Sequence, residues 1–588
     1  MNQDPNTDNA YQRFLAGLKS SDERYDPEAR MIRRPFSSPG YHTALQGGFV
    51  HPTRDSLGYA VSCLDAGDEE HRKRAEDVLP RVISLQDQDP SSRTYGIWPW
   101  YYEEPLSKMA APDWNWADFC GVSLAQVILH HGDRISEAAR TGVERSLKHA
   151  CESIMRRDVG PGYTNIAIMG TYVTLVAGER LGWKDVESYG QKRLKRFYDY
   201  TMARKSFDEY NSPTYTRVAI GELSRLLSDV RSPDAVPLIR ELHDFAWHHM
   251  ARRFHAPTRQ WAGPHSRCYS TLQGREFLAY LDARSGGRLH FLPPDEVDEG
   301  WPRKAIRMPE SVLPYFGPLA EPRTETEVFV PAGENTAQLV GTTYLHPKFT
   351  LGSVNRSDLW NQRRAVVAYW GTPDEPSYLH LRFLHDGYDF CSAWVFTAQH
   401  EGSLLTAVTF STDGGDTHPS LDKVKDGRIH ASDLRLRLEI GGAAAKRVES
   451  REWNIAEPLN LSLDGLNLNL QVPSSSFGAQ GVWGRVLGAR DAGAVMRPRP
   501  GQRPGADAAA VDVIVHTGSE KVFELAQLRP TFVALALGIG PGVAKYPWAK
   551  VTANGDLTLS WDLPTPLRLS APIGPVPAAE LLRRYKSM

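Results

Sequence analysis

The hydrophobic pattern changes its period near residue 300, and this change limits the fold more than any other feature of the chain. Before it, strongly apolar segments occur at helical spacing, and each except the last is followed by a charged amphipathic partner. The apolar segments are 57–64, 119–129, 166–176, 218–223 and 272–281. They begin about every 50 to 60 residues, which is typical of repeated helical hairpins. An inner ring of buried helices and an outer ring of solvated helices would explain this alternation.

Towards the carboxyl end, the apolar residues alternate with a period of two, as in half-buried strands. The alternating segments are 337–344, 364–370, 378–383, 434–440, 466–472, 510–515 and 557–561. Glycine, aspartate and proline turns separate them, which predicts a large antiparallel sandwich. A proline-rich passage from about 293 to 324 lies between the two patterns and is typical of a linker or a bridging loop.

We therefore predict an α+β multidomain protein with three parts. Residues 1–300 are expected to form an (α/α) helical toroid, 301–325 a Pro-rich linker, and 326–588 an antiparallel β-sandwich. A chain of 588 residues is too long for one ordinary core, which agrees with this division.

The charge balance argues against several classes of partner. The formal net charge is -2, so neither a dedicated nucleic-acid binder nor a membrane-surface protein is expected, although a local basic cleft for an acidic ligand is compatible with it. The 15 Trp, 23 Tyr and 20 Phe residues supply rings on which sugars stack, as well as core. The five cysteines are widely spaced, which predicts single buried thiols without a disulfide framework or a zinc site.

The amino terminus, residues 1–9, is polar and acidic, without the basic region and apolar stretch of a signal peptide. No run of about 18 apolar residues follows it. The sequence thus predicts a cytoplasmic protein, or a secreted one if a leader has been removed. We expect neither a cofactor nor a metal, since no clustered set of metal ligands is present. The oligomeric state stays open.

Three chemically different polar residues, His265, Arg267 and Tyr269, recur at every second position before the last apolar segment. If residues 261–269 are extended, all three side chains point the same way. The phenol can then abstract a weakly acidic carbon-bound proton, the guanidinium favours the ionised phenol, and the imidazole donates to a carboxylate. The alternative is that Tyr269 begins a helix and the other two are surface or bridging residues.

Two further loops that lead into apolar helices carry candidate residues. Asn165 ends the turn 160–165, where its amide either donates to a substrate carboxylate or caps the helix. In the loop 207–217, Asn211 and Tyr215 are four residues apart and lie on one side of the helix entry. Capping explains Asn211 or its neighbour Ser212, but not the two acids and two tyrosines in the same loop, which favour a functional loop.

Two more segments supply aromatic and charged residues. In 98–118, Trp114, Asn115 and Trp116 make a sugar platform or, alternatively, wedge between helices. In 352–364, several hydrogen-bond donors and one ring reach the glycan from the second domain, although a solvated hairpin over a packed tryptophan is the default. These residues are Arg356, Trp360, Gln362 and Arg363.

Taken together, the helical hairpins with polar entries and the β domain resemble the toroid-plus-sandwich polysaccharide lyases, the group that contains chondroitin AC, heparinase II/III and alginate lyases. The segments that carry the resemblance are Tyr163–Asn165, Asn211–Tyr215, His265–Tyr269 and Tyr344–Ser353. The resemblance covers nearly the whole chain in architecture but only short stretches in motif, and no subfamily is assigned. The chain departs from the alginate-type enzymes in lacking an Asn-Asn-His run, and its His, Arg and Tyr are unusually close together.

The resemblance implies β-elimination at a uronic acid of an acidic polysaccharide or oligosaccharide, without a cofactor. Asn165 or Asn211, supported by His265, would neutralise the uronate carboxylate as negative charge moves onto it. Tyr215 or Tyr269 would be the base or the acid. Arg267 would lower a tyrosine pKa or hold an acidic group of the substrate. The expected substrate-binding residues are Tyr163, Trp114, Asn115, Trp116, Tyr210, Glu209, Arg356, Trp360 and Arg363.

Two rival functions remain open. A glycoside hydrolase would need two carboxylates in the same toroid, and the candidates are Glu103, Glu104, Asp113, Asp118, Asp208 and Glu209. A noncatalytic glycan-binding protein would need the aromatic platforms but no acid or base. Neither a nucleic acid nor a membrane is expected as a partner.

Overall fold

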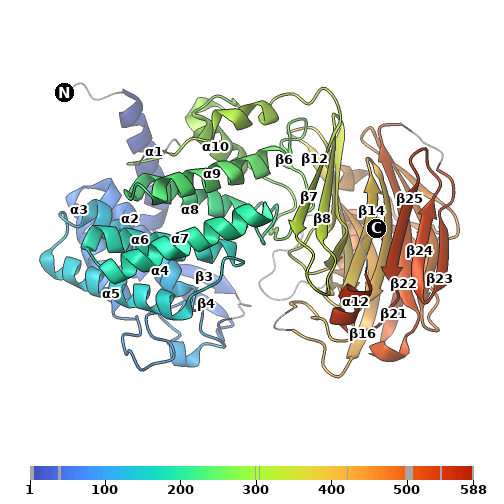
Figure 1. The fold of residues 1–588 in the computed structure, drawn as a ribbon, viewed down its shortest axis with the longest axis horizontal. Coiled ribbons are helices and arrows are strands. Elements are labelled where there is room, and N and C mark those ends of the chain that lie inside the picture. The colour runs from blue at the N-terminus through green and yellow to red at the C-terminus, as the bar shows by residue number, and fades with distance from the viewer. Residues whose placement is uncertain are drawn as a thin grey trace.

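The structure is a computed structural model that describes residues 5–37, 42–297, 300–303, 305–419, 422–496, 508–542 and 546–585. Helices occupy the amino-terminal half and sheets the carboxyl-terminal half, so the protein is a mixed α+β chain (Figure 1). The longer helices are α1 (Pro5–Asp22), α2 (Thr53–Ala66), α3 (Glu69–Ile83), α4 (Trp116–His131), α5 (Glu137–Arg157), α6 (Thr164–Leu181), α7 (Lys184–Arg204), α8 (Tyr215–Asp229), α9 (Ala235–Ala251) and α10 (Arg275–Ser285).

The helices from α2 to α9 form four hairpins, each made of a buried and a more solvated member. The buried members α2, α4, α6 and α8 contact one another in sequence, and the solvated members contact each other outside them. Helix α6 shows the cause, because its residues from Thr164 to Gly178 are mostly apolar or small and all are buried. Since successive hairpins run the same way, the first turns of the four buried helices lie at one end of this layer, beside the loops that precede them.

Short strands and turns complete the helical half. The two-residue and four-residue strands pair locally, and they are β1 (Tyr25–Asp26), β2 (Met31–Ile32), β3 (Arg34–Ser37), β4 (Gly47–Val50), β5 (Phe254–His255) and β6 (Gln260–Trp261). All five cysteines are buried and unpaired, as predicted. Among the described residues, no helix is both long and apolar enough to span a bilayer.

The proline-rich segment is more than the linker predicted for 301–325. Residues Glu310–Phe316 form the 3-10 helix η3, and Met308, Val312 and Phe316 are buried in the same apolar cluster as the helices. The first strand of the large sheet, β7, begins at Arg323. The prolines therefore shape a segment that closes the helical core, because its apolar residues between the prolines find a surface to bury against.

Three antiparallel sheets make up the second half. Nine strands of the ten-stranded sheet follow the order β17 (Arg451–Trp453), β20 (Trp483–Leu487), β21 (Ala509–Glu524), β16 (Arg428–Gly442), β12 (Pro376–His385), β11 (Val366–Gly371), β9 (Phe349–Val354), β8 (Leu339–His346) and β7 (Arg323–Val330), and β13 (Tyr388–Asp389) pairs with β12. The six-stranded sheet follows the order β10 (Arg356–Asp358), β14 (Ala393–His400), β15 (Ser403–Phe410), β22 (Thr531–Gly540), β19 (Leu466–Phe477) and β18 (Leu459–Leu463). The third sheet contains β23 (Lys550–Asn554), β24 (Asp556–Trp561) and β25 (Leu567–Pro572).

The period-two pattern places one apolar core between the two larger sheets. In β16, Leu434, Leu436, Leu438 and Ile440 alternate into this core and meet apolar residues of β15, β19 and β22. The third sheet covers the opposite face of the six-stranded sheet, where Leu559 and Trp561 pack with residues of β14, β15 and β22. Two short helices, α11 (Ala489–Val495) and α12 (Ala578–Arg584), border the sheets.

The two halves meet where the loop after β6 lies against the ten-stranded sheet. His265 and Arg364 exchange two backbone hydrogen bonds of 3.0 and 2.9 Å, and the Cys268 amide donates to the Gln362 carbonyl at 2.7 Å. A Cβ atom on Gly352 would stand 2.1 Å from the Gly263 carbonyl oxygen, so only glycine permits this approach. The contact fixes the loop 263–272 between the helix entries and the sheet.

Candidate active site

Two tyrosine hydroxyls meet where this loop passes the start of α8. Tyr215 is the first residue of α8, and its hydroxyl is 2.7 Å from that of Tyr269, close enough for either to donate to the other. The rings meet edge to face with centroids 6.0 Å apart. Tyr269 is 60 % exposed, whereas Tyr215 is largely covered. The pair therefore has one member open to solvent and one held in the fold.

Arg267 supplies a positive charge to this pair. Its Nη2 donates to the Tyr215 hydroxyl at 3.0 Å, and its guanidinium lies 4.4 Å from the centre of the Tyr215 ring. Burial raises the pKa of Tyr215 and the nearby Tyr269 hydroxyl raises it further, while Arg267 opposes both. Arg267 is thus the group that favours an ionised phenol here.

Residues of the loop between β10 and β11 hold Arg267 in place. Its Nε donates to the Gln362 side-chain oxygen at 2.6 Å, and the guanidinium lies 4.9 Å from the centre of the Trp360 ring. His418 packs edge to face on Trp360 with centroids 5.0 Å apart. His418 could not be predicted from the sequence, because it lies in a turn-rich segment without a motif. The site is therefore built from both halves of the protein.

Glu209 lies on the other side of Arg267. Its Oε1 is 3.6 Å from Arg267 Nη1, and its Oε2 accepts from the Asn165 backbone amide at 3.3 Å. Burial raises the pKa of Glu209 to about 7, against the opposing effect of Arg267. Oε1 is buried and has no hydrogen-bond partner among the described residues. The carboxyl group is therefore poised between its neutral and charged forms near neutral pH.

A polar chain continues from Glu209 along the entries of α6 and α4. The Asn165 side-chain oxygen accepts from the Ile166 amide at 2.9 Å, and among the described residues its Nδ2 donates to no acceptor. Tyr163 is 40 % exposed, and its hydroxyl accepts from Asn115 Nδ2 at 3.2 Å. Arg157 donates to the Asn115 oxygen at 2.6 Å. Asn165, Tyr163 and Asn115 thus lie along one path from the phenol pair.

The two predicted platform tryptophans differ in their surroundings. Trp116 stacks on Trp100 with ring centroids 5.0 Å apart, and its indole donates to Thr53 Oγ1 at 2.9 Å. Trp116 therefore packs between elements, in line with the alternative interpretation. Trp114 is half-buried beside a surface cavity, and its indole donates to the Arg93 carbonyl at 3.3 Å.

The polar side-chain atoms of Asn211 are all bonded within the protein. Its Nδ2 donates to the Ala262 and Pro264 carbonyls at 2.9 and 2.7 Å, and its Oδ1 accepts from the Trp261 indole at 2.6 Å. The side chain is fully buried, so its amide has no hydrogen left for a carboxylate. Its neighbour Ser212 is the residue that caps α8, since its Oγ accepts from the Tyr215 amide at 2.9 Å.

His265 does not share a surface with Arg267 and Tyr269, contrary to the alternation argument. The chain leaves strand geometry after Trp261, and His265 is 1 % exposed. Its Nδ1 bonds to the Asn211 carbonyl at 2.8 Å and its Nε2 lies 3.3 Å from the Tyr369 hydroxyl. Burial lowers the pKa of His265 to about 3, so the ring is neutral and structural.

Four expected substrate-binding residues are engaged inside the protein. Tyr210 is buried and stacks on Phe329 with centroids 4.2 Å apart. Arg356 donates to the Ala337 carbonyl at 2.6 Å, and Arg363 pairs with Asp358. Trp360 is buried and contacts Arg267 with its ring face. They support the site from behind and do not line it, because their side chains contact other parts of the protein.

A family model described as a domain of unknown function (DUF8769) matches residues 12–280, within the helical half. No curated protein matches the sequence. Within the described ranges, no group of three or more His, Cys, Asp or Glu side chains is arranged to hold a metal ion.

Two solved structures align with most of the chain at low similarity. A heparinase III is 10 % identical, with 89 % of this chain and 83 % of that chain covered and a TM-score of 0.35. A mutant heparan sulfate lyase from Pedobacter heparinus is 9 % identical, with 88 % and 82 % covered and a TM-score of 0.33. Scores at this level do not establish a shared fold.

Proposed function

We propose that this protein is a polysaccharide lyase that cleaves a uronic-acid-containing glycan by β-elimination, with an (α/α) toroid followed by an antiparallel β-sandwich. The observation that carries the proposal is the pair of hydrogen-bonded phenols, Tyr215 and Tyr269, contacted by the Arg267 guanidinium. Proton removal from carbon needs a base, and Arg267 is the group at the phenol pair that opposes the raised pKa of Tyr215 and favours its ionised form.

In the proposed reaction, a phenolate removes the C5 proton, the C–H electrons form the C4–C5 double bond, and the C4–O bond breaks. The leaving oxygen takes a proton from a phenol. Because the two hydroxyls are 2.7 Å apart, a proton received by one can pass to the other. Arg267 stabilises negative charge directly on Tyr215, and on Tyr269 through the Tyr215 hydroxyl.

The uronate carboxylate must be neutralised as charge moves onto it. The Arg267 guanidinium is a donor beside the phenol pair, and the Asn165 Nδ2 is a further donor at the entry of α6, where the Asn165 backbone amide bonds to Glu209. Glu209, whose pKa burial raises to about 7, donates a further hydrogen bond when it is protonated. We assign this role to Asn165, Arg267 and Glu209. The polar side-chain atoms of Asn211 and His265 are bonded inside the fold, so these two residues do not take it.

The raised pKa of Glu209 also supports a second candidate, a glycoside hydrolase. A general acid in such an enzyme needs a raised pKa, and it needs a second carboxylate across the scissile bond. The phenol pair has no part in that reaction. The two candidates therefore differ in which residues they require.

The deciding experiment is a screen of uronate-containing polysaccharides for new ultraviolet-absorbing ends, with reducing ends measured in parallel. Elimination creates a conjugated double bond, whereas hydrolysis gives reducing ends without absorbance. We expect Tyr215→Phe or Tyr269→Phe to lower turnover by about two or more orders of magnitude. Tyr198→Phe is the matched control, because its hydroxyl bonds to Glu241 on the helical surface.

Near-normal elimination by both active-site variants would refute the proposed mechanism. Reducing ends that depend on Glu209 but lack absorbance would identify a hydrolase. Binding of a glycan without either product would identify a noncatalytic binding protein.

A further inference from the structure

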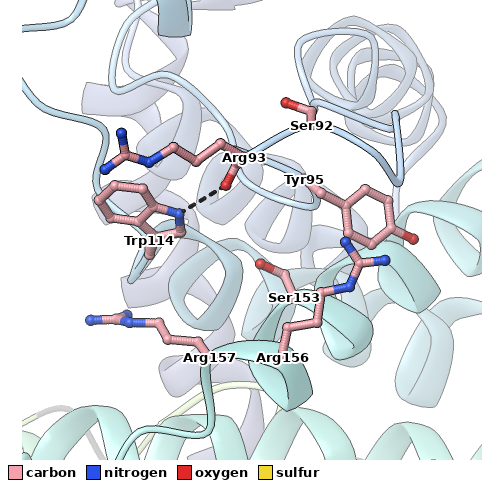
Figure 2. Close-up of a pocket in the computed structure, with 7 residues that line it drawn as sticks. All are labelled: Ser92, Arg93, Tyr95, Trp114, Ser153, Arg156 and Arg157. Atoms are coloured by element: carbon pink, nitrogen blue, oxygen red, sulfur yellow. Dashed lines mark hydrogen bonds between the residues drawn. The ribbon is translucent and has the colours of Figure 1, made fainter.

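A polar surface cavity lies at the end of the hydrogen-bonded series that runs from Tyr163 through Asn115 to Arg157. Its volume is about 270 Å³, and three arginines, Arg93, Arg156 and Arg157, line it together with Trp114. Figure 2 shows Arg93 beside Trp114, Arg157 below that ring, and Arg156 beside Tyr95. Pockets for drug-sized ligands are about 300–1,000 Å³, so this one suits a single sugar unit or an acidic substituent.

The three guanidinium groups lack the ion-pair partners that other arginines nearby have. Arg140 and Arg196 on α5 and α7 pair with Glu144 and Asp158. Among the described residues, no carboxylate lies within 4 Å of Arg93, Arg156 or Arg157. Arg156 donates only to the Pro90 carbonyl at 2.9 Å, and Arg157 only to Asn115. Most of their N–H donors therefore remain available to an anion.

Aromatic rings hold two of these arginines in place. The Arg156 guanidinium lies 4.2 Å from the centre of the Tyr95 ring, and that of Arg93 lies 5.5 Å from the centre of the Trp114 ring. The Tyr95 hydroxyl is fixed in turn by Glu152 and by His149 at 2.6 Å. Such stacking reduces the entropy lost when an arginine binds an anion.

Helix electrostatics account for only part of this cluster. Arg156 and Arg157 are in the last turn of α5, where positive charge is favoured by the helix dipole. Arg93 comes from a separate loop after α3, and no helix end explains its position. Three like charges in one cavity repel one another, so an anion between them relieves an unfavourable arrangement.

We infer that this cavity is a subsite for an oxyanion of the glycan, either a sulfate ester or a second uronate carboxylate, with Trp114 stacking on the sugar ring. The inference rests on the proposed function, because a glycan bound at the phenol pair is what would extend into this cavity. Hydrogen bonds link the cavity to the phenol site: Arg157 donates to Asn115, Asn115 donates to the Tyr163 hydroxyl, and Tyr163 lies two residues before Asn165, whose backbone amide donates to Glu209. The substrate class is thus a glycan with an acidic group on more than one sugar.

The test is glycan binding by a protein that does not turn over. In the Tyr215→Phe/Tyr269→Phe background, affinity is measured by calorimetry for a chondroitin sulfate tetrasaccharide and for its desulfated counterpart. We expect Arg93→Gln/Arg156→Gln to weaken binding by at least about tenfold, since charge-assisted hydrogen bonds to an oxyanion are lost. The matched control is Arg180→Gln/Lys192→Gln, which removes two charges from exposed positions outside the cavity.

Each outcome decides the inference. Weaker binding of the sulfated sugar alone supports a sulfate ester as the ligand, and weaker binding of both sugars supports a carboxylate. An affinity equal to that of the control variant, or no binding by the parent, overturns the inference. If arginine-dependent binding is found but no glycan yields unsaturated ends, the subsite stands and the proposed lyase activity fails.

Discussion

At the scale of single residues, Arg267 connects the groups on which the chemistry depends. It donates to Tyr215 and to Gln362 and lies 3.6 Å from Glu209. The sequence predicted Arg267 as a charge beside a phenol, and the structure places it there. The same pattern predicted His265 beside it, but a two-residue alternation holds only while the chain is extended, and here the chain turns.

Removing the Arg267 charge should slow the reaction and shift its pH dependence. Arg267 opposes the effects that raise the Tyr215 pKa, so Arg267→Gln should raise that pKa further. We expect turnover at neutral pH to fall about 100-fold or more and the ascending limb of the pH–rate profile to move to higher pH. Arg267→Lys keeps the charge and should recover part of both effects. An unchanged pH profile in Arg267→Gln would contradict this role.

Glu209 should make stability depend on pH in a direction unusual for a carboxylate. Its folded pKa, about 7, is above the usual value of 4.5. At a pH between these two pKa values, the folded state holds a proton that the unfolded state has released. The stabilisation that this bound proton gives to the folded state is full at low pH and is lost as the pH rises through 7. Urea unfolding measures the free energy of unfolding at pH 5 and at pH 7.5. Glu209→Gln should remove up to about 3 kcal/mol of the difference between the two values. An identical pH dependence in the variant would refute the assignment.

At the scale of secondary-structure elements, the entries of the buried helices carry the site. The periodicity of the sequence indicated which helices are buried, and their first turns bring Asn115, Asn165 and Tyr215 to one end of the layer. The sequence also indicated a cap at Asn211 or Ser212. Choosing between them required the contacts, because Asn211 uses its amide on the loop 261–264 instead.

The Ser212 cap should affect both stability and activity. Its hydroxyl accepts from the Tyr215 amide and donates to the Arg267 carbonyl at 2.6 Å, so it joins the two elements that hold the phenol pair. We expect Ser212→Ala to lower the free energy of unfolding by about 1 kcal/mol and to reduce turnover. Ser136→Ala removes a comparable cap, on the Ala139 amide of α5, and should lower stability alone. Equal activity in the two variants would show that the Ser212 tie is not needed.

At the scale of the whole molecule, a buried ion pair joins the two halves. Glu327 of β7 accepts from Arg253 at 2.7 Å, and His249 lies 3.1 Å away. Burial alone would raise the pKa of Glu327, but these basic neighbours lower it to about 2. Burial also lowers the pKa of His249, and Arg253 bonds to the carboxylate directly. The pair orients β7 against the helices and with it the sheet that holds Gln362 and Trp360.

Breaking this pair should destabilise the protein. Glu327→Gln leaves Arg253 buried without its counter-charge, so we expect a loss of about 3–5 kcal/mol in urea unfolding at pH 7. Because the folded pKa is below the usual value, this stabilisation is present above about pH 4.5 and is lost as the pH falls towards 2. Glu325→Gln is the control on the same strand, since Glu325 is 3.5 Å from Arg323 at a less buried position. A similar small loss in both variants would contradict the role of Glu327.

The sequence alone determined the change from helices to strands, the helices that are buried, and the residue types at the helix entries. These properties follow from local periodicity, because the spacing of apolar residues dictates which face of an element is buried. Only the tertiary structure decided which candidates are bonded inside the fold and which are exposed. Asn211 and His265 face inward while Tyr269 and Tyr163 face solvent, and Arg93 joins Arg156 and Arg157 across some 60 residues. Such choices depend on contacts between distant segments, and the spacing of residues along a single chain does not encode which segments meet.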